Sequence, residues 1–122
     1  MSIEVNIDQT GTEEFAQALN RFDTGMQQQL HERLSEWAES VKTEAARLAP
    51  AKTGYLRSTL YARTREWEAE VGAEASYAAS VEFGTRNARA KPFLAPAVQS
   101  RLPNLERLIL QALDQAKTEA DL

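Results

Sequence analysis

Few side chains in this chain are of a type that catalyses reactions or binds metal ions. The 122 residues contain no cysteine and a single histidine, His31. Disulfide bonds, thiolate catalysis and cysteine-ligated zinc are therefore excluded, and a zinc site lacks enough imidazole ligands. Glu66, Glu68 and Glu70 offer carboxylates at i, i+2 spacing, which in a strand places them on one solvated face. We expect no catalytic centre, no metal and no cofactor.

The histidine is poorly placed for catalysis. His31 directly follows Leu30, and one step along a helix turns the side chain by about 100°, away from the apolar side. The chain also lacks the glycine-rich phosphate-binding patterns and a serine in a nucleophile elbow. The alternative of an enzyme without a recognisable motif would require a deep pocket lined by convergent polar groups.

Basic side chains are concentrated in the middle of the chain. Residues 52–101 carry eight basic and five acidic side chains, a balance of +3, whereas residues 1–51 have a balance of −5 and residues 102–122 of −2. The middle is therefore where we expect an acidic partner to bind. The other interpretation is that these cations solvate one face of a sheet.

A small nucleic-acid-binding module that uses segment 52–101 is an alternative function. The segment interleaves three tyrosines with its cations, as stacking on bases requires; the residues are Tyr55, Arg57, Tyr61, Arg63, Arg65, Tyr77, Arg86, Arg89 and Lys91. Against this alternative, the isoelectric point is about 5.1, whereas nucleic-acid-binding domains are usually basic as a whole.

The periodicity of apolar residues predicts the elements that position these side chains. Apolar residues recur every three or four positions over about 26–48, which predicts a long helix that ends at Ala49-Pro50. Residues 2–8 alternate as a half-buried strand does. Residues 10–22 predict a short helix, and Asp23-Thr24-Gly25 predicts its end.

A β-hairpin is predicted at about 60–72. Pairing Leu60 with Val71 keeps the glutamates on the exposed face and sets Arg63 opposite Glu68. The same register sets an aromatic ring opposite a carboxylate, in the pair Tyr61 and Glu70. Because the connection contains no Gly or Asn, we expect a looser loop rather than a tight turn.

The last third of the chain predicts a short helix, a basic loop and a long helix. Residues 76–83 read as the short helix, with Tyr77, Val81 and Ala78 inward and Gly84 at its end, and residues 85–91 as the loop.

Two prolines, Pro92 and Pro96, favour extended backbone between them. The final helix is predicted at about 97–118, either kinked at Pro103 or restarted there. These elements together predict an α+β fold, in which the long helix and the C-terminal helix cover a small antiparallel sheet, in one domain of residues 1–122.

Three clusters carry a resemblance to a known family. They contain Pro50, Thr53, Gly54, Leu56 and Arg57; then Tyr77, Ala78, Glu82, Phe83, Gly84 and Thr85; then Pro92, Phe93, Leu94 and Pro96. In this order and spacing, the chain resembles the tail-completion, or neck, family of long-tailed bacteriophages and prophages. That family is of the Hong Kong 97 tenth-gene-product type and is related to lambda minor tail protein Z. The resemblance covers about residues 26–120.

The residue types in these clusters point to structural roles. Pro50 ends a helix, and Gly54 permits a turn with positive φ. We expect Glu82 to accept hydrogen bonds from backbone N–H groups of a neighbouring turn. Phe93 and Leu94 are expected to be anchors inserted into the core or into a neighbouring subunit.

The basic loop is the candidate contact with a partner, through Arg86, Arg89 and Lys91. A highly charged loop between two rigid motifs is a common position for such contacts.

The resemblance implies a non-enzymatic virion protein at the head–tail junction or the top of the tail. It implies a homo-oligomeric ring, hexameric or twelve-fold, with DNA passing through the lumen without specific binding. The implied partners are other neck or tail proteins: the connector, the tail terminator or the tail tube. The implied location is the virion, and the host cytoplasm during assembly, with no membrane contact.

Overall fold

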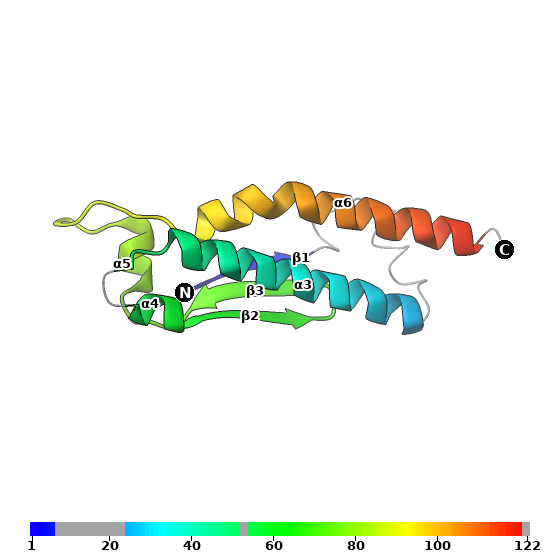
Figure 1. Cartoon of the computed structure of the whole chain (residues 1–122), viewed down its shortest axis with the longest axis horizontal. Coiled ribbons are helices and arrows are strands. Elements are labelled where there is room, and N and C mark those ends of the chain that lie inside the picture. The colour runs from blue at the N-terminus through cyan, green and yellow to red at the C-terminus, as the bar shows by residue number, and fades with distance from the viewer. Residues whose placement is uncertain (7–23, 52–53, 121–122) are drawn as a thin grey trace.

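The computed structural model of the chain describes residues 1–6, 24–51 and 54–120. It confirms the α+β class: two long helices, α3 (Thr24–Leu48) and α6 (Leu94–Ala120), lie side by side over a small sheet (Figure 1). The predicted short helix at residues 10–22 lies outside the described residues. Thr24 and Gly25, which we expected to end that short helix, are the first residues of α3.

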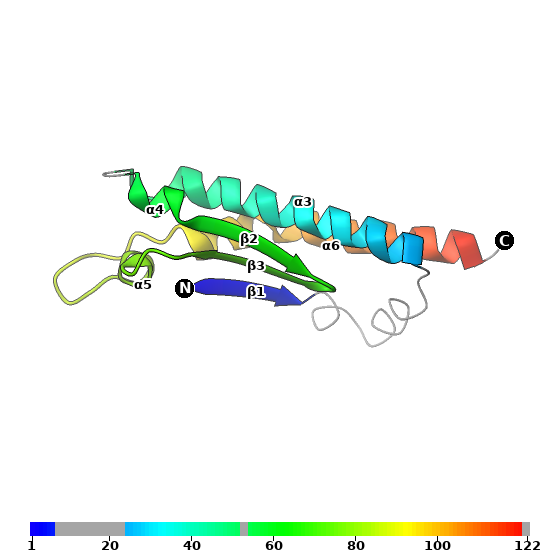
Figure 2. The same cartoon turned by 90° about the horizontal axis from the view of Figure 1, so that it is seen from below.

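The sheet has three antiparallel strands in the order β1-β3-β2. The strands are β1 (Ser2–Asn6), β2 (Leu60–Arg65) and β3 (Glu68–Ala73). Both long helices lie on the same side of the sheet, behind it in Figure 2. No described helix covers the opposite side of the sheet, which we call the outer face.

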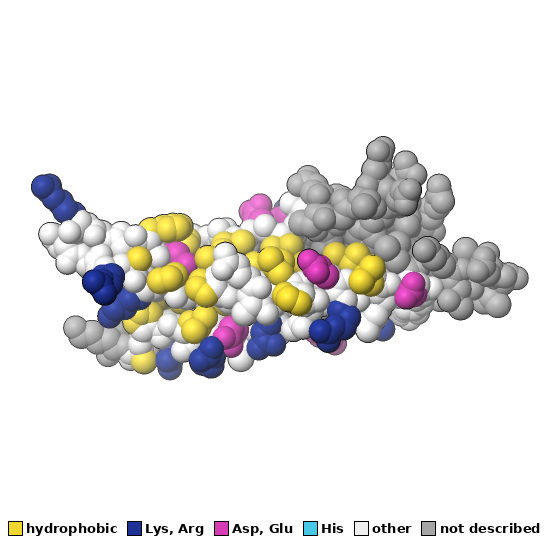
Figure 3. Space-filling view, turned by 90° about the horizontal axis from the view of Figure 1, so that it is seen from above, with side chains coloured by type: hydrophobic (Ala, Val, Ile, Leu, Met, Phe, Trp, Pro, Cys, Tyr) yellow, Lys and Arg dark blue, Asp and Glu magenta, His cyan; other side chains and the backbone are white. Residues whose placement is uncertain are grey.

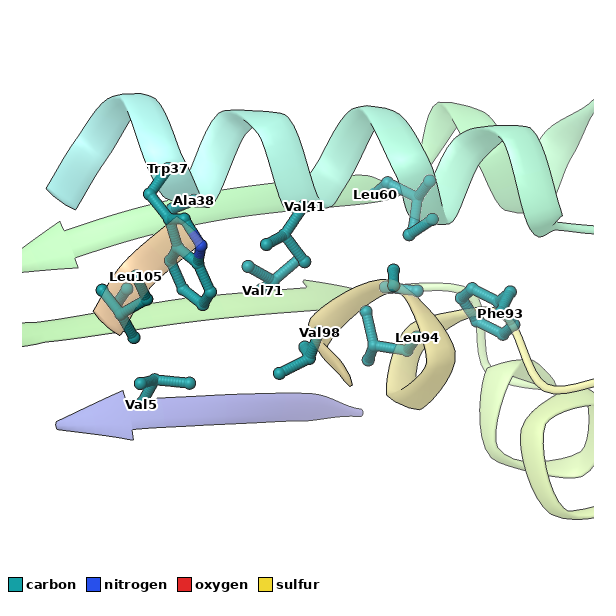
Figure 4. Packing of buried hydrophobic residues seen from close by; sticks show 14 of the residues in the cluster. Val5, Trp37, Ala38, Val41, Leu60, Val71, Phe93, Leu94, Val98 and Leu105 are labelled. Atoms are coloured by element: carbon teal, nitrogen blue, oxygen red, sulfur yellow. The ribbon is translucent and has the colours of Figure 1, made fainter. Parts of the chain in front are cut away.

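The core lies between the helices and the inner side of the sheet. Val41 of α3 and Leu94 of α6 are fully buried, and Val71 of β3 is nearly so. Figure 4 shows these side chains meeting, with Val5 of β1 at the far edge. The apolar stripe predicted for the long helix is therefore the side that packs on the sheet.

The hairpin register differs from the predicted one by two residues. Leu60 pairs with Ala73, so Arg63 lies opposite Glu70 rather than Glu68. Because a shift of two preserves the side-chain alternation, the apolar residues still face the core.

The hairpin connection is a tight two-residue turn, not the looser loop that we expected. It consists of Glu66 and Trp67, and Glu66 adopts φ 48°. A left-handed residue at this place supplies the twist that Gly or Asn usually provides.

The C-terminal helix starts earlier than predicted. Leu94 and Ala95 are helical rather than extended, and Pro96 lies in the first turn, where no helical N–H is needed. The helix runs on through Pro103 without restarting. Preceding it, α5 (Ala78–Phe83) ends at Gly84, as predicted.

Candidate functional site

The three clusters meet at one end of the molecule. We call residues 50–51, 54–58 and 75–97 the motif end. It includes α4 (Tyr55–Ser58), α5, the basic loop and the first turn of α6, and it lies at the left of Figure 1. Residues separated by some forty positions in the chain are therefore neighbours here.

Glu82 holds this end together. Its side chain is only 3% exposed. Oε1 accepts hydrogen bonds from the backbone N–H groups of Phe93 (3.2 Å) and Leu94 (2.8 Å), and Oε2 accepts one from Ala95 (3.2 Å). The carboxylate thus occupies the N-terminus of α6, where unpaired N–H groups and the helix dipole favour negative charge. The prediction that Glu82 accepts backbone N–H bonds is confirmed.

The anchors between the two prolines fill the chain's own core. Phe93 and Leu94 are both fully buried, beside Leu60 and Val98 (Figure 4). They insert into the core of this chain, which was one of the two expectations. Burying both side chains contributes roughly 3–6 kcal/mol from removal of apolar surface from water.

Gly84 lets the basic loop fold back on α5. It adopts φ 78° and ψ 171°, a region that is essentially restricted to glycine. A Cβ there would lie 2.7 Å from the backbone nitrogen of Ala90. The loop is closed by a 2.8 Å hydrogen bond from the Lys91 N–H to the Val81 carbonyl, and by one of the same length from the Thr85 N–H to the Ala88 carbonyl.

The cations of the loop point to solvent. Arg86, Arg89 and Lys91 are exposed, and none forms an ion pair with a described residue. Basic side chains project from the left-hand tip in Figure 3, the end at which the loop lies in Figure 1. Arg57 of α4 is also exposed and unpaired among the described residues.

The first cluster forms a short helix that the sequence analysis did not predict. Gly54 precedes α4 with φ 71°, as expected for a turn with positive φ, and Leu56 is buried beneath it. The prediction for Thr53 lies outside the described residues. Pro50 follows the end of α3, as predicted.

Thr59 connects α4 to the second cluster and was also missed. Its hydroxyl donates to the Leu56 carbonyl at 2.9 Å and accepts from the Ala75 N–H at 3.1 Å. Its carbonyl accepts from the Glu74 N–H at 3.1 Å. A lone threonine between a helix and a strand gave no sequence signal for this role.

A groove of about 440 Å³ runs between these elements. The first two clusters and the basic loop contribute to its lining, which is Pro50, Leu56, Tyr77, Ser80, Val81, Thr85, Ala88, Arg89 and Lys91. The lining is mainly apolar and includes two cations, Arg89 and Lys91. We call it the motif groove.

Aromatic side chains are exposed at the motif end. Tyr77 was predicted to face inward but is exposed, whereas Ala78 is buried as predicted and shares the buried side of α5 with Glu82. Its ring lies 6.1 Å from that of Tyr55, tilted by 38°. Phe83 is 73% exposed, unusually so for a large apolar side chain.

Arg63 and Arg65, two further cations of segment 52–101, lie on β2 and outside the motif end. Arg63 is on the outer face, 4.4 Å above the ring of Tyr61 and 3.4 Å from a carboxylate oxygen of Glu74. Tyr61 donates a 2.9 Å hydrogen bond to Glu70, diagonally across the strands. Burial, reinforced by this bond, raises the pKa of the Tyr61 hydroxyl. Strand β2 runs away from the motif end (Figure 2). Arg65, at the far end of the strand, is therefore about 17 Å from Leu60, at its near end.

A second groove, of about 610 Å³, follows the seam between α3 and α6. Its polar side chains bond to one another across the helices. Arg33 donates to Gln111 at 3.4 Å, and the indole N–H of Trp37 donates to the Arg101 carbonyl at 2.8 Å. These contacts fasten the helices, so we assign the seam a structural role.

The described residues contain no group of three or more side chains suited to hold a metal ion. In the same ranges, every helix is too short or too polar to cross a membrane. No protein-family model, curated protein or solved structure matches the chain.

Proposed function

We propose that this protein is a non-enzymatic structural component of a phage or prophage virion. In this proposal it acts at the head–tail junction or the top of the tail by assembling into a ring. The observation that carries the proposal is the convergence of the three clusters on one end of the molecule. The residues that resemble the tail-completion family build one continuous structural unit around Glu82.

The chemistry of that end suits contact with other proteins. It combines a mainly apolar groove, exposed aromatic side chains and cations that form no ion pair with a described residue. Interfaces are enriched in aromatic residues and arginine in this way. The partners in the particle would be the connector, the tail terminator or the tail tube, and DNA would pass through the lumen without specific binding.

We do not extend the proposal to a nucleic-acid-binding module. Its cations are divided between the motif end and the outer face of the sheet, and Arg63 is already engaged by Tyr61 and Glu74. A single stacking platform that combines Tyr61 with Tyr55 and Tyr77 is not formed, because Tyr61 lies on the outer face.

Electron microscopy of lysates tests the proposed function. The gene is deleted from a phage or inducible prophage that carries it, and the wild-type gene supplied in trans is the control. We expect full heads beside separate tails, or tails of aberrant length, with normal particles restored by the control. Normal infectious virions from the deletion would contradict the proposal.

A further inference from the structure

We propose that the motif groove docks a second copy of this chain, and that the outer face of the sheet is the surface it binds. The inference rests on the proposed ring assembly and names the two surfaces that would form its repeated interface. Each copy would use its motif end toward one neighbour and its outer face toward the other.

The motif end carries positive charge that no ion pair with a described residue neutralises. Residues 50–51, 54–58 and 75–97 contain four basic side chains and one acidic one, Glu82, a balance of +3. Glu82 is buried and bonded to backbone N–H groups, so it is not available to the surface cations. Outside the motif end, the side chains that the structure describes include seven basic and eleven acidic ones, a balance of −4. A second copy therefore offers a surface of opposite charge.

The outer face carries three carboxylates, Glu4, Glu68 and Glu70, and two cations, Arg63 and Arg65. Glu4 of β1 lies directly opposite Glu70 of β3, and Asn6 lies opposite Glu68. Like charges opposite one another on neighbouring strands are destabilising. Across β3, Arg63 lies opposite Glu70 but is engaged by Glu74 and Tyr61, and Arg65 lies opposite Glu68, so no cation lies directly opposite Glu4 on the described strands. An arginine or lysine from another molecule would relieve this repulsion.

The two surfaces lie on different parts of the molecule. The motif end is the tip formed by α4, α5 and the basic loop, whereas the outer face extends along the sheet on the side away from both long helices (Figure 2). A copy can therefore use both at once. Such a head-to-tail contact is heterologous, and it closes into a ring when its rotation allows.

The apolar part of the motif groove favours protein over nucleic acid as the occupant. Tyr77 lines the groove together with Arg89 and Lys91, and aromatic side chains and arginine are enriched in protein interfaces. The acidic remainder of the chain would repel a DNA backbone. Binding of DNA is nevertheless a defined outcome of the test below.

A charge-swap experiment tests the pairing of the two surfaces. The tip variant is Arg89→Glu with Lys91→Glu, and the face variant is Glu4→Lys with Glu68→Lys; all four side chains are at least partly exposed. A matched control, Lys42→Glu with Arg107→Glu, makes the same charge change as the tip variant on the long helices. Circular dichroism and thermal melting establish that each variant is folded.

Sedimentation velocity then measures self-association. We expect wild type and the control to associate, and each swap variant alone to associate at least about tenfold more weakly because like charges meet. An equimolar mixture of the two swap variants should regain association. In that mixture an acidic tip meets a basic face, and a basic tip meets an acidic face, so alternating copies are complementary throughout.

The outcomes separate this inference from the proposed function. Swap variants that associate like wild type, or a mixture that fails to regain association, would overturn the docking while the deletion phenotype still supports a neck protein. A wild-type chain that stays monomeric at millimolar concentration would overturn the docking as well. Salt-dependent binding of that monomer to an unrelated DNA duplex, lost in the tip variant, would replace the second copy by nucleic acid.

Discussion

The motif end and the seam between α3 and α6 both fasten segments that are far apart in the chain, but they do so with different chemistry. At the motif end, one buried carboxylate, Glu82, accepts three backbone N–H groups. Along the seam, side chains with access to solvent bridge the helices one by one. These bridges include Gln29 with Gln115 and Glu44 with Arg101.

The difference lies in what replaces each contact when it is lost. Water can take over the exposed bonds of the seam, so each of them contributes little to stability. Buried N–H groups have no such substitute, so loss of their acceptor costs the full desolvation of each group. The motif end therefore depends on a few buried hydrogen bonds that water cannot replace, whereas the seam depends on many exposed ones that water can replace.

The largest effect is expected at Glu82. Glu82→Ala leaves the N–H groups of Phe93 and Leu94 buried without an acceptor, and should lower the free energy of unfolding by roughly 3–5 kcal/mol. Glu82→Gln keeps one oxygen acceptor and should cost about 1–3 kcal/mol. Urea denaturation at neutral pH measures both. Equal and small losses would contradict the role of the carboxylate.

The two glycines with positive φ provide the next comparison. At Gly84 the backbone region is nearly exclusive to glycine and a Cβ would collide with Ala90, so Gly84→Ala should cost roughly 2–3 kcal/mol. At Gly54 no atom lies within 4 Å of the added Cβ, so Gly54→Ala should cost only about 1 kcal/mol of left-handed strain. Thermal denaturation of both variants ranks them, and the reverse order would contradict the close approach at Gly84.

A smaller effect is expected in the seam at Trp37. Trp37→Phe keeps an aromatic ring but removes the indole N–H that donates to the Arg101 carbonyl. We expect a loss of about 1–2 kcal/mol, because the smaller ring also leaves unfilled space at a side chain that is only 5% exposed. Urea denaturation measures it. A loss as large as that of Glu82→Ala would show that water cannot replace this hydrogen bond of the seam.

The smallest effect is expected at Glu44, and it should depend on pH. A hydrogen bond from Arg47, followed by the charges of Arg47 and Arg101, holds the pKa of the Glu44 carboxyl below its ordinary value. A lowered pKa in the folded state stabilises the fold above the ordinary value of 4.5, and this is lost as pH falls through the folded pKa. Glu44→Gln should therefore melt slightly below wild type at neutral pH, with the difference vanishing in acid. A difference that grows in acid would contradict this sign.

The features that depend on local spacing and side-chain chemistry could be predicted from the sequence. The long helix, the hairpin faces and the role of Glu82 follow from local spacing and side-chain chemistry, and the structure confirms them. The register was wrong by two because Glu66 adopts the left-handed turn conformation that its residue type rarely takes.

The motif groove could not be derived from spacing at all. Four residues are too few to show a helical period, so α4 gave no signal. The rings of Tyr77 and Tyr55 lie side by side because the next residues along the chain, Ala78 and Leu56, are buried in the core. Whether two clusters become neighbours depends on how the helices cross the sheet, which no local pattern records.

The strand order has a consequence for how the chain is made. Strand β1 is synthesised first, yet its only described partner is β3, whose residues emerge some sixty positions later. The hairpin of β2 and β3 can close as soon as it appears, because its contacts are local. Until β1 returns to it, one edge of β3 is an open template for pairing with another chain. Pairing of β1 with β3 is thus the step that closes this edge against aggregation during synthesis.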